Sequence, residues 1–195
     1  AYSSVASFTT LASGGTSYCE SKGNNYSYEW IAKVVIGSFT NSSSAAGYTD
    51  FTNKTITMTA GTAYSIALTP GFASSTYNEY WKIWVDLNGN GVFDSNELLF
   101  DPGSMSKTTV TGTITIPAGT AARTTRMRVS MKYNAAQTAC ETFSYGEVED
   151  YTVQIVAGSA NPPATPTGLN VSSITTSGAT LSWNAATGAT SYDVQ

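Results

Sequence analysis

The chain has 195 residues, of which 11% are charged, and 13 acidic against 9 basic side chains give a formal net charge of −4. Histidine is absent, which excludes a Ser-His-Asp triad, a Cys-His pair or an HExxH zinc site built from this chain alone. The few basic residues argue against nucleic-acid binding, and no apolar run approaches the roughly 20 residues that span a membrane.

Segments with alternating or β-branched sequences predict short strands, because Gly, Pro, Asn and Ser clusters separate them. The expected strands are Trp30–Phe39, Lys54–Thr59, Ala63–Leu68, Tyr80–Asp86, Thr108–Ile116, Thr125–Tyr133 and Tyr145–Ile155. No long window keeps a helical period. The pattern predicts an all-β fold, an antiparallel, jelly-roll-like β-sandwich over residues 1–157.

Cys19 and Cys140 are the only cysteines. The composition is rich in Ser, Thr, Asn and Tyr and poor in Lys, as in exported proteins, where a disulfide persists. We therefore expect a secreted or cell-surface protein with a Cys19–Cys140 bridge, which would stabilise the fold by ~4 to 5 kcal/mol on the chain-entropy model. The alternative is two unrelated buried thiols.

Aromatic residues gather near two of the predicted strands. Tyr26, Tyr28 and Trp30 alternate and would share one strand face, although Trp30 and Trp81 are expected to belong to the core. The candidates for exposure and ligand contact are Tyr26, Tyr28, Tyr77 and Tyr80. Exposed rings stack on sugars or on protein chains. A coplanar row would favour a glycan, whereas a grooved or mixed polar patch would favour a protein.

Residues 86–97 fit the twelve-residue pattern of a calcium-binding loop. The expected Ca²⁺ ligands are oxygens of Asp86, Asn88, Asn90, Val92, Asp94 and Glu97. No helix is expected on either side, so this is the loop without an EF-hand. We predict a structural calcium ion with a dissociation constant on the order of 10⁻⁵ to 10⁻³ M, as in extracellular modules. The alternative is an Asn/Gly-rich hairpin turn whose acids are solvated.

Charge is concentrated in the last two predicted strands of the sandwich. The residues concerned are Arg126, Arg128, Glu147, Glu149 and Asp150. Alternation places Glu147 and Glu149 on the apolar face of their strand, so either a bulge switches faces or the glutamates point inward and must be paired. The main interpretation is a structural cross-strand Arg–Glu ladder. A second metal site and a paired-carboxylate hydrolase are the functional alternatives.

The sequence changes character at Gly158. Residues 158–166 read as a Pro-rich linker. Residues 167–195 resemble the beginning of a fibronectin type III domain, so the chain is expected to stop inside a second domain. The features that carry this resemblance are Pro166, Leu169, Val171, Trp183, Ala189 and Tyr192.

Several motifs, in order along the chain, resemble those of the GEVED domain over roughly residues 18 to 155. They are Tyr18-Cys19, Glu29-Trp30-Ile31, the segment 41–52, the stretch Trp84–Phe93, the strand Thr125–Val129, Cys140 and the run Gly146–Asp150. The resemblance implies a β-sandwich accessory module of secreted bacterial multidomain proteins, often attached to metallopeptidases or other hydrolases. The family pattern includes no catalytic residues.

The leading functional hypothesis is a non-catalytic module that binds an extracellular polymer, either a glycan or a fibrous protein, beside neighbouring domains of the same polypeptide. The second is a spacer or adhesin segment in a surface stalk, held by the disulfide and calcium. An enzyme is the least favoured class, because it would need a deep pocket with convergent acids and has no histidine to use.

Overall fold

The computed structural model describes residues 18–158, 164–187, 189, 191 and 192. The chain divides into two compact units, one ending at Gly158 and the other beginning at Ser159. The predicted linker at 158–166 falls largely on residues 159–163, which lie outside the described residues. Nothing in the described part of the chain forms a helix long and apolar enough to cross a membrane.

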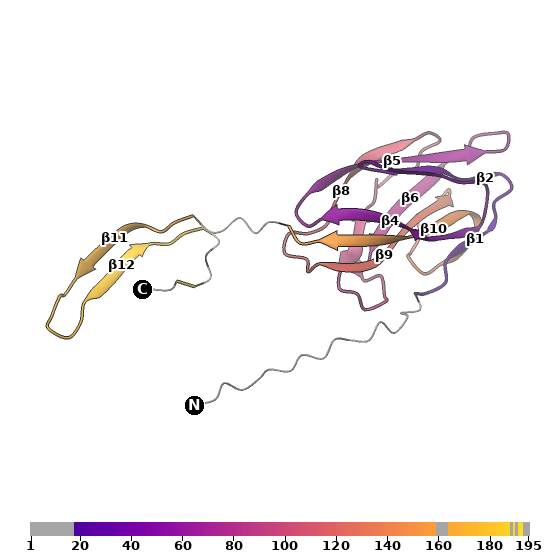
Figure 1. Cartoon of the computed structure of the whole chain (residues 1–195). Coiled ribbons are helices and arrows are strands. Elements are labelled where there is room, and N and C mark those ends of the chain that lie inside the picture. The colour runs from indigo at the N-terminus through magenta and orange to yellow at the C-terminus, as the bar shows by residue number, and fades with distance from the viewer. Residues whose placement is uncertain (1–17, 159–163, 188, 190, 193–195) are drawn as a thin grey trace, which may run out of the picture. The chain divides into compact units, whose positions relative to one another are not determined.

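The first unit is a sandwich of two sheets (Figure 1). The larger sheet contains β1 (Lys22–Asn25), β4 (Tyr48–Thr59), β6 (Glu79–Val85), β7 (Leu98–Phe100), β9 (Arg123–Tyr133) and β10 (Thr142–Val156). Its order is β1-β10-β9-β6-β7, and β4 continues along the same edge of β10 as β1. The pairs β10·β9, β9·β6 and β6·β7 are antiparallel, whereas β1 and β4 each run parallel to β10.

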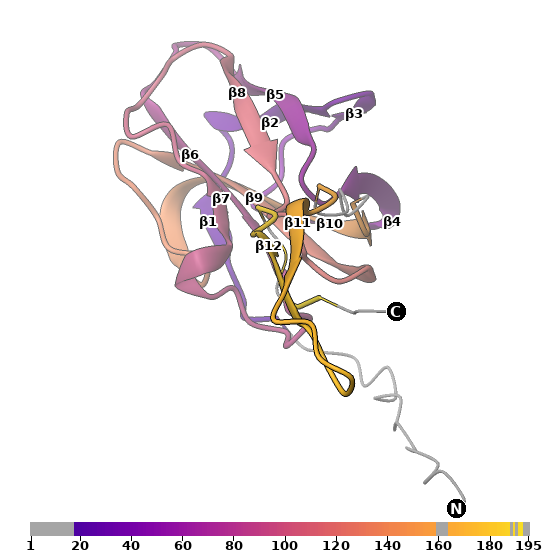
Figure 2. The same cartoon turned by 90° about the vertical axis from the view of Figure 1, so that its left-hand side faces the viewer.

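The smaller sheet packs over the larger one, as both views show (Figures 1 and 2). It contains β2 (Glu29–Ile36), β3 (Phe39–Ser42), β5 (Ala63–Phe72) and β8 (Val110–Thr115), in the order β3-β2-β5-β8 and antiparallel throughout. The only helical element in the described residues is the 3₁₀ turn η1 (Ser95–Glu97). The prediction of an all-β sandwich is therefore confirmed, with two parallel pairings that the sequence pattern did not indicate.

The core lies between the sheets and is built by strand alternation. On β9, Met127, Val129 and Met131 are all 0% exposed, which confirms the face predicted for them. Trp81 of β6 is fully buried in the same core, as predicted. Trp30 of β2 is only half-buried, on the face that packs over Gly71.

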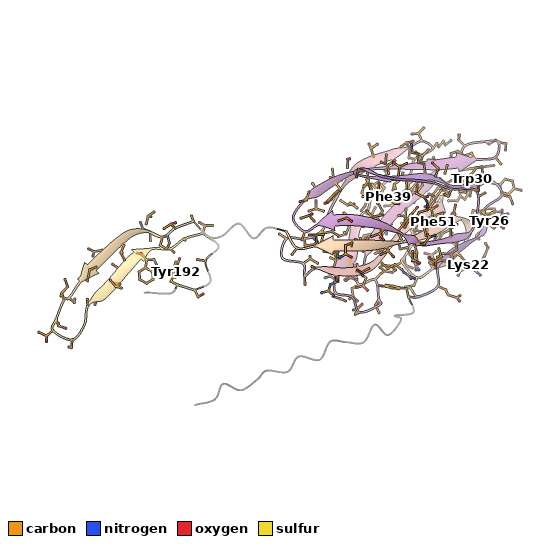
Figure 3. The ribbon with its side chains drawn as sticks, viewed as in Figure 1. Lys22, Tyr26, Trp30, Phe39, Phe51 and Tyr192 are labelled. Atoms are coloured by element: carbon orange, nitrogen blue, oxygen red, sulfur yellow. A yellow bond between two sulfur atoms is a disulfide. The ribbon has the colours of Figure 1, made fainter. Side chains whose placement is uncertain are left out.

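The second unit contains the antiparallel pair β11 (Thr167–Ser172) and β12 (Thr180–Asn184). Trp183 packs edge-on against Tyr192, with ring centroids 5.3 Å apart (Tyr192 is labelled in Figure 3). Leu169 and Ile174 are largely exposed.

Candidate functional site

The loop after β6, residues 86–97, is organised around a buried carboxylate. Asp86 is 0% exposed and accepts hydrogen bonds from the backbone N–H groups of Gly89 (2.6 Å) and Gly91 (2.9 Å). The Tyr18 hydroxyl donates to the same carboxylate at 2.7 Å. Gly91 has a φ of 82°, a conformation that a side chain would strain. Asp86 therefore holds the turn by gathering backbone donors.

A second buried carboxylate closes this loop from its far end. Glu97 is also 0% exposed, and it accepts the backbone N–H groups of Leu87 (2.7 Å) and Asp94 (2.9 Å). Asp94 in turn accepts the side-chain amides of Asn88 (3.0 Å) and Asn90 (3.1 Å). These polar side chains are thus engaged within the loop, and the alternative of simply solvated acids is wrong for Asp86 and Glu97.

Asp86 and Glu97 are the two fully buried acids of the loop that is predicted to bind calcium. Asp86 and Glu97 belong to none of the ion pairs between described residues, so their negative charge is buried without a basic partner. No group of three or more acidic, histidine or cysteine side chains in the described part is arranged to hold a metal ion. The loop therefore offers buried charge that a cation would offset, but its hydrogen bonds already define its shape.

Glu147 and Glu149 of β10 point between the two sheets, and both are 0% exposed. Glu147 accepts the backbone N–H of Ile31 at 2.8 Å and the hydroxyl of Thr49 at 3.0 Å. The Ser43 hydroxyl donates to Glu149 at 2.5 Å. Burial raises the pKa of Glu147 to about 8 and that of Glu149 to about 7. Of the two arrangements left open by the alternation, the inward one is correct.

The predicted Arg–Glu ladder is wrong, because the arginines pair with Asp150. Arg128 lies directly opposite Asp150 across β9 and β10 and donates two hydrogen bonds to its carboxylate, each 2.8 Å long. Arg126 adds a longer contact of 3.5 Å to the same carboxylate. Since Glu147 and Glu149 sit on the opposite face of β10, no arginine on the Asp150 face reaches them, and neutral donors serve them instead.

The same arginine ties the disulfide to this face. The Cys19–Cys140 bridge is present, which confirms the predicted pairing. Arg128 donates to the backbone carbonyls of Cys19 (2.9 Å) and Ala139 (2.7 Å). A shallow pocket of about 260 Å³ lies here, lined by Tyr18, Cys19, Glu20, Ser21, Lys22, Tyr48, Arg126, Arg128 and Asp150. Its strongest charges already pair with each other, so it offers a ligand little uncompensated charge.

A second pocket, of about 290 Å³, lies at one end of the sandwich and is walled by tyrosines. Tyr28, Tyr77, Tyr133 and Tyr145 form a closed ring of four neighbouring pairs, with centroids 6.5, 5.8, 6.1 and 6.1 Å apart taken round the ring. The angles between their planes run from 59° to 87°, so the rings enclose a space rather than form a flat row. We call these four residues the tyrosine cage.

Strand ends converge to build the cage. Tyr28 immediately precedes β2, Tyr77 precedes β6, Tyr133 ends β9 and Tyr145 lies near the start of β10. These strands belong to both sheets, since β2 is in the smaller sheet and β6, β9 and β10 are in the larger one. The cage therefore bridges the two sheets at one end of the sandwich. Tyr28, Tyr133 and Tyr145 remain between 38% and 47% exposed.

One buried glutamate, Glu29, lines the pocket of the cage, and a second, Glu79, lies near enough to Glu29 to be affected by its charge. Glu29 lines the pocket and is 2% exposed, and Glu79 is 0% exposed with neither carboxylate oxygen hydrogen-bonded. Glu79 lies directly opposite Tyr133 in the β6·β9 ladder, so both side chains are on the inner face. Burial, with a further contribution from the Glu29 charge, raises the pKa of Glu79 to about 8. Burial also raises the pKa of Glu29.

Of the tyrosines predicted to contact a ligand, Tyr28 and Tyr77 are in the cage. Tyr26, labelled in Figure 3, is 44% exposed, but none of the ring pairs of the cage includes it. The expected shared face of Tyr26, Tyr28 and Trp30 is wrong, because β2 begins only at Glu29 and the two tyrosines lie in the preceding turn.

Tyr80 lies on the outer face of β6, away from the cage, and its hydroxyl donates to Asp101 at 2.7 Å. Tyr133, Tyr145, Glu29 and Glu79 were not among the site residues predicted from the sequence. The sequence did contain one signal for the two glutamates: both stand at inward positions of apolar strands, where acidic side chains are rarely buried.

A protein-family model described as the GEVED domain matches residues 80–154, a stretch that contains the calcium-type loop, two of the four cage tyrosines and the Gly146–Asp150 run. No curated protein matches the chain.

Proposed function

We propose that this chain is a non-catalytic accessory module of a secreted bacterial multidomain protein, such as a metallopeptidase or another hydrolase, and that its tyrosine cage binds a fibrous extracellular protein. The match to the GEVED domain supports the accessory role. The disulfide supports export, since such bonds persist in oxidising compartments.

The tyrosine cage is the single observation that carries the binding function. Aromatic side chains lining a pocket and left partly exposed are the residues that dominate binding energies at protein interfaces. Their planes are steeply inclined to one another, whereas successive sugars of a polysaccharide need a coplanar row. The mixed polar and aromatic lining therefore favours a protein over a glycan.

Calcium stabilisation of the loop at 86–97 forms a further part of this proposal. Its support is electrostatic: Asp86 and Glu97 bury negative charge outside any ion pair of the described residues, and Asp94 adds a third carboxylate nearby. A bound cation would offset this charge. Its role would be to stabilise the long turn between β6 and β7.

Residues 167–195 are proposed to belong to a fibronectin type III domain. The antiparallel pair β11·β12 and the packing of Trp183 on Tyr192 support this assignment.

The binding proposal predicts that removing two cage rings abolishes adhesion. The double change Tyr28→Ala and Tyr145→Ala should weaken co-sedimentation of the whole chain with insoluble collagen at least about tenfold, because buried aromatic contacts contribute about 2 kcal/mol or more each at interface centres. The matched control is Tyr26→Ala, which removes a comparably exposed ring outside the cage and should leave binding unchanged.

Parallel assays on cellulose and chitin separate the alternatives. Cage-dependent binding to a glycan in place of collagen would overturn the preference for protein. Binding to none of these polymers would support the spacer or adhesin role.

A further inference from the structure

The tyrosine cage combines aromatic walls with two buried acids, of which Glu79 has no hydrogen-bond partner among the described residues. Glu79 is completely buried and both of its oxygens lack a hydrogen bond, and Glu29 faces the pocket at 2% exposure. A buried carboxyl without a partner costs free energy, so native structures rarely keep one unless it serves a purpose. Here Glu29 lines the pocket that the four tyrosines surround, and Glu79 lies close to Glu29 and opposite Tyr133.

The electrostatics of this arrangement suit a positive charge. The face of an aromatic ring carries partial negative charge and attracts a cation within about 6 Å. The cation–π contacts among the described residues involve Phe51, Tyr80, Trp84, Tyr18, Phe93 and Phe143, and none involves a cage tyrosine. The faces of the cage rings are thus left for a cation of another molecule.

The cage favours an organic cation over a metal ion. Hard cations need six to eight oxygen ligands, but the pocket is lined by four tyrosine rings and a single carboxylate, that of Glu29. At about 290 Å³ the pocket is at the lower end of ligand sites, which run to about 1,000 Å³. Its volume suits one side chain better than an oligomer.

We propose that the tyrosine cage binds an alkylammonium group, namely the lysine side chain of an extracellular protein, with Glu29 and Glu79 as its counter-ions. This inference rests on the proposed function and names the chemistry that the cage recognises. Lysine is chosen over arginine because a closed wall of inclined rings surrounds a compact charge, whereas a planar guanidinium prefers to stack on a ring face.

Glu79 must be ionised to act as a counter-ion, and ionising it costs part of the binding free energy at low pH. The affinity of the cage for the ammonium group should therefore depend on pH. The Glu29 carboxyl of β2 is the charged group that acts on Glu79, and Tyr133 of β9 lies opposite it in the β6·β9 ladder. Burial, with a further contribution from the Glu29 charge, raises the pKa of Glu79 to about 8. Below this value the ammonium must displace a proton; above it the carboxylate is already charged.

The test uses Nα-acetyl-lysine methylamide as the probe and the whole chain as receptor, followed by isothermal titration calorimetry. The probe should bind more tightly as pH rises from 6 to 8, by up to about fiftyfold, and less steeply beyond. Its Nε-acetyl derivative, which has no charge, should bind at least about tenfold more weakly. Equal binding of both, or preference for the arginine analogue, would overturn the proposal.

Variants assign the effect to the cage. Glu79→Gln keeps the side-chain shape and should weaken probe binding and remove its pH dependence, and Glu29→Gln should weaken binding about tenfold. Tyr26→Ala should change neither. Circular dichroism melts establish that both glutamine variants fold, as expected when a buried acid becomes neutral.

The lysine inference and the binding function can fail separately. Collagen whose lysines have been acetylated should lose binding to the chain. If this acetylated collagen binds as well as the native form, while Tyr28→Ala with Tyr145→Ala still abolishes adhesion, the lysine inference is overturned and the binding function stands. If the cage changes leave collagen binding intact, the binding function at this site is overturned.

Discussion

Arg128 shows how one residue joins several parts of this sandwich. It is 2% exposed, donates two parallel hydrogen bonds to Asp150, and reaches the carbonyls of Cys19 and Ala139. It therefore connects strands β9 and β10 to both segments that the disulfide joins. Bidentate bonds between a guanidinium and a carboxylate are among the stronger side-chain interactions in proteins.

At this scale we predict that Arg128→Met destabilises the fold by about 3 to 5 kcal/mol, because Asp150 would remain buried with its main partner removed. Urea denaturation followed by tryptophan fluorescence measures the loss. Arg126→Met is the matched control: it removes a half-buried arginine 3.5 Å from the same carboxylate and should cost about 1 kcal/mol or less. Equal losses for the two variants would refute the assigned roles.

Strand β10 makes specific contacts along its backbone and on both of its faces. Gly146 has a φ of 119°, and a Cβ atom there would lie 2.1 Å from the Met131 carbonyl oxygen on β9. Glycine is thus required where β10 approaches its neighbour most closely. The following residues alternate: Glu147 and Glu149 face the interior and Asp150 faces Arg128. The Gly-Glu-Val-Glu-Asp run therefore encodes structural contacts on both faces of one strand.

For the loop at 86–97, we predict that 10 mM calcium raises the melting temperature by roughly 5 °C or more. This follows from about 2.7 kcal/mol of binding at a hundredfold excess over the dissociation constant. Glu97→Gln should abolish the shift, whereas the exposed Glu20→Gln should retain it. Differential scanning calorimetry with calcium and with EDTA measures both. A melting temperature that is the same with calcium and with EDTA would contradict the calcium proposal. The loop's own hydrogen bonds would then account for its conformation.

For the whole molecule, buried acids predict how stability depends on pH. Burial raises the folded-state pKa of Glu79 and Glu147 to about 8 and that of Glu149 to about 7, against 4.5 in the unfolded chain. Between these values the folded state holds more protons than the unfolded state, so the free energy of unfolding falls as pH rises. Melts in EDTA should therefore give a lower melting temperature at pH 8 than at pH 5.

Glu79→Gln provides the control for this trend, since it removes one of the titrating groups and should flatten the decline. On the acid side the sign reverses. The pKa values of Asp50, Asp101 and Glu141 are lowered by hydrogen bonds and nearby lysine or arginine charge, which outweigh burial. Stability should thus also fall below about pH 4, as these carboxylates are protonated. A melting temperature that rises steadily from pH 5 to pH 8 would refute the assignment.

Much of the fold could be predicted from the sequence because strand formation depends on local alternation. Met127, Val129 and Met131 were placed correctly on the core face, and Trp81 was placed in the core. The sequence left two possible orientations for Glu147 and Glu149, and it did not indicate their hydrogen-bond partners. Those partners come from β2, β4 and the segment after β3, which no local pattern connects to β10.

The tyrosine cage marks the limit of such reasoning. By itself the sequence determined the all-β class, the core face of strands such as β9 and the cysteines available for a disulfide, because each depends on residue type or on a two-residue period. Only the tertiary structure decided that Tyr28, Tyr77, Tyr133 and Tyr145 meet around Glu29. The physical reason is that sheet order and register bring distant strand ends together, and these are set by packing over the whole domain.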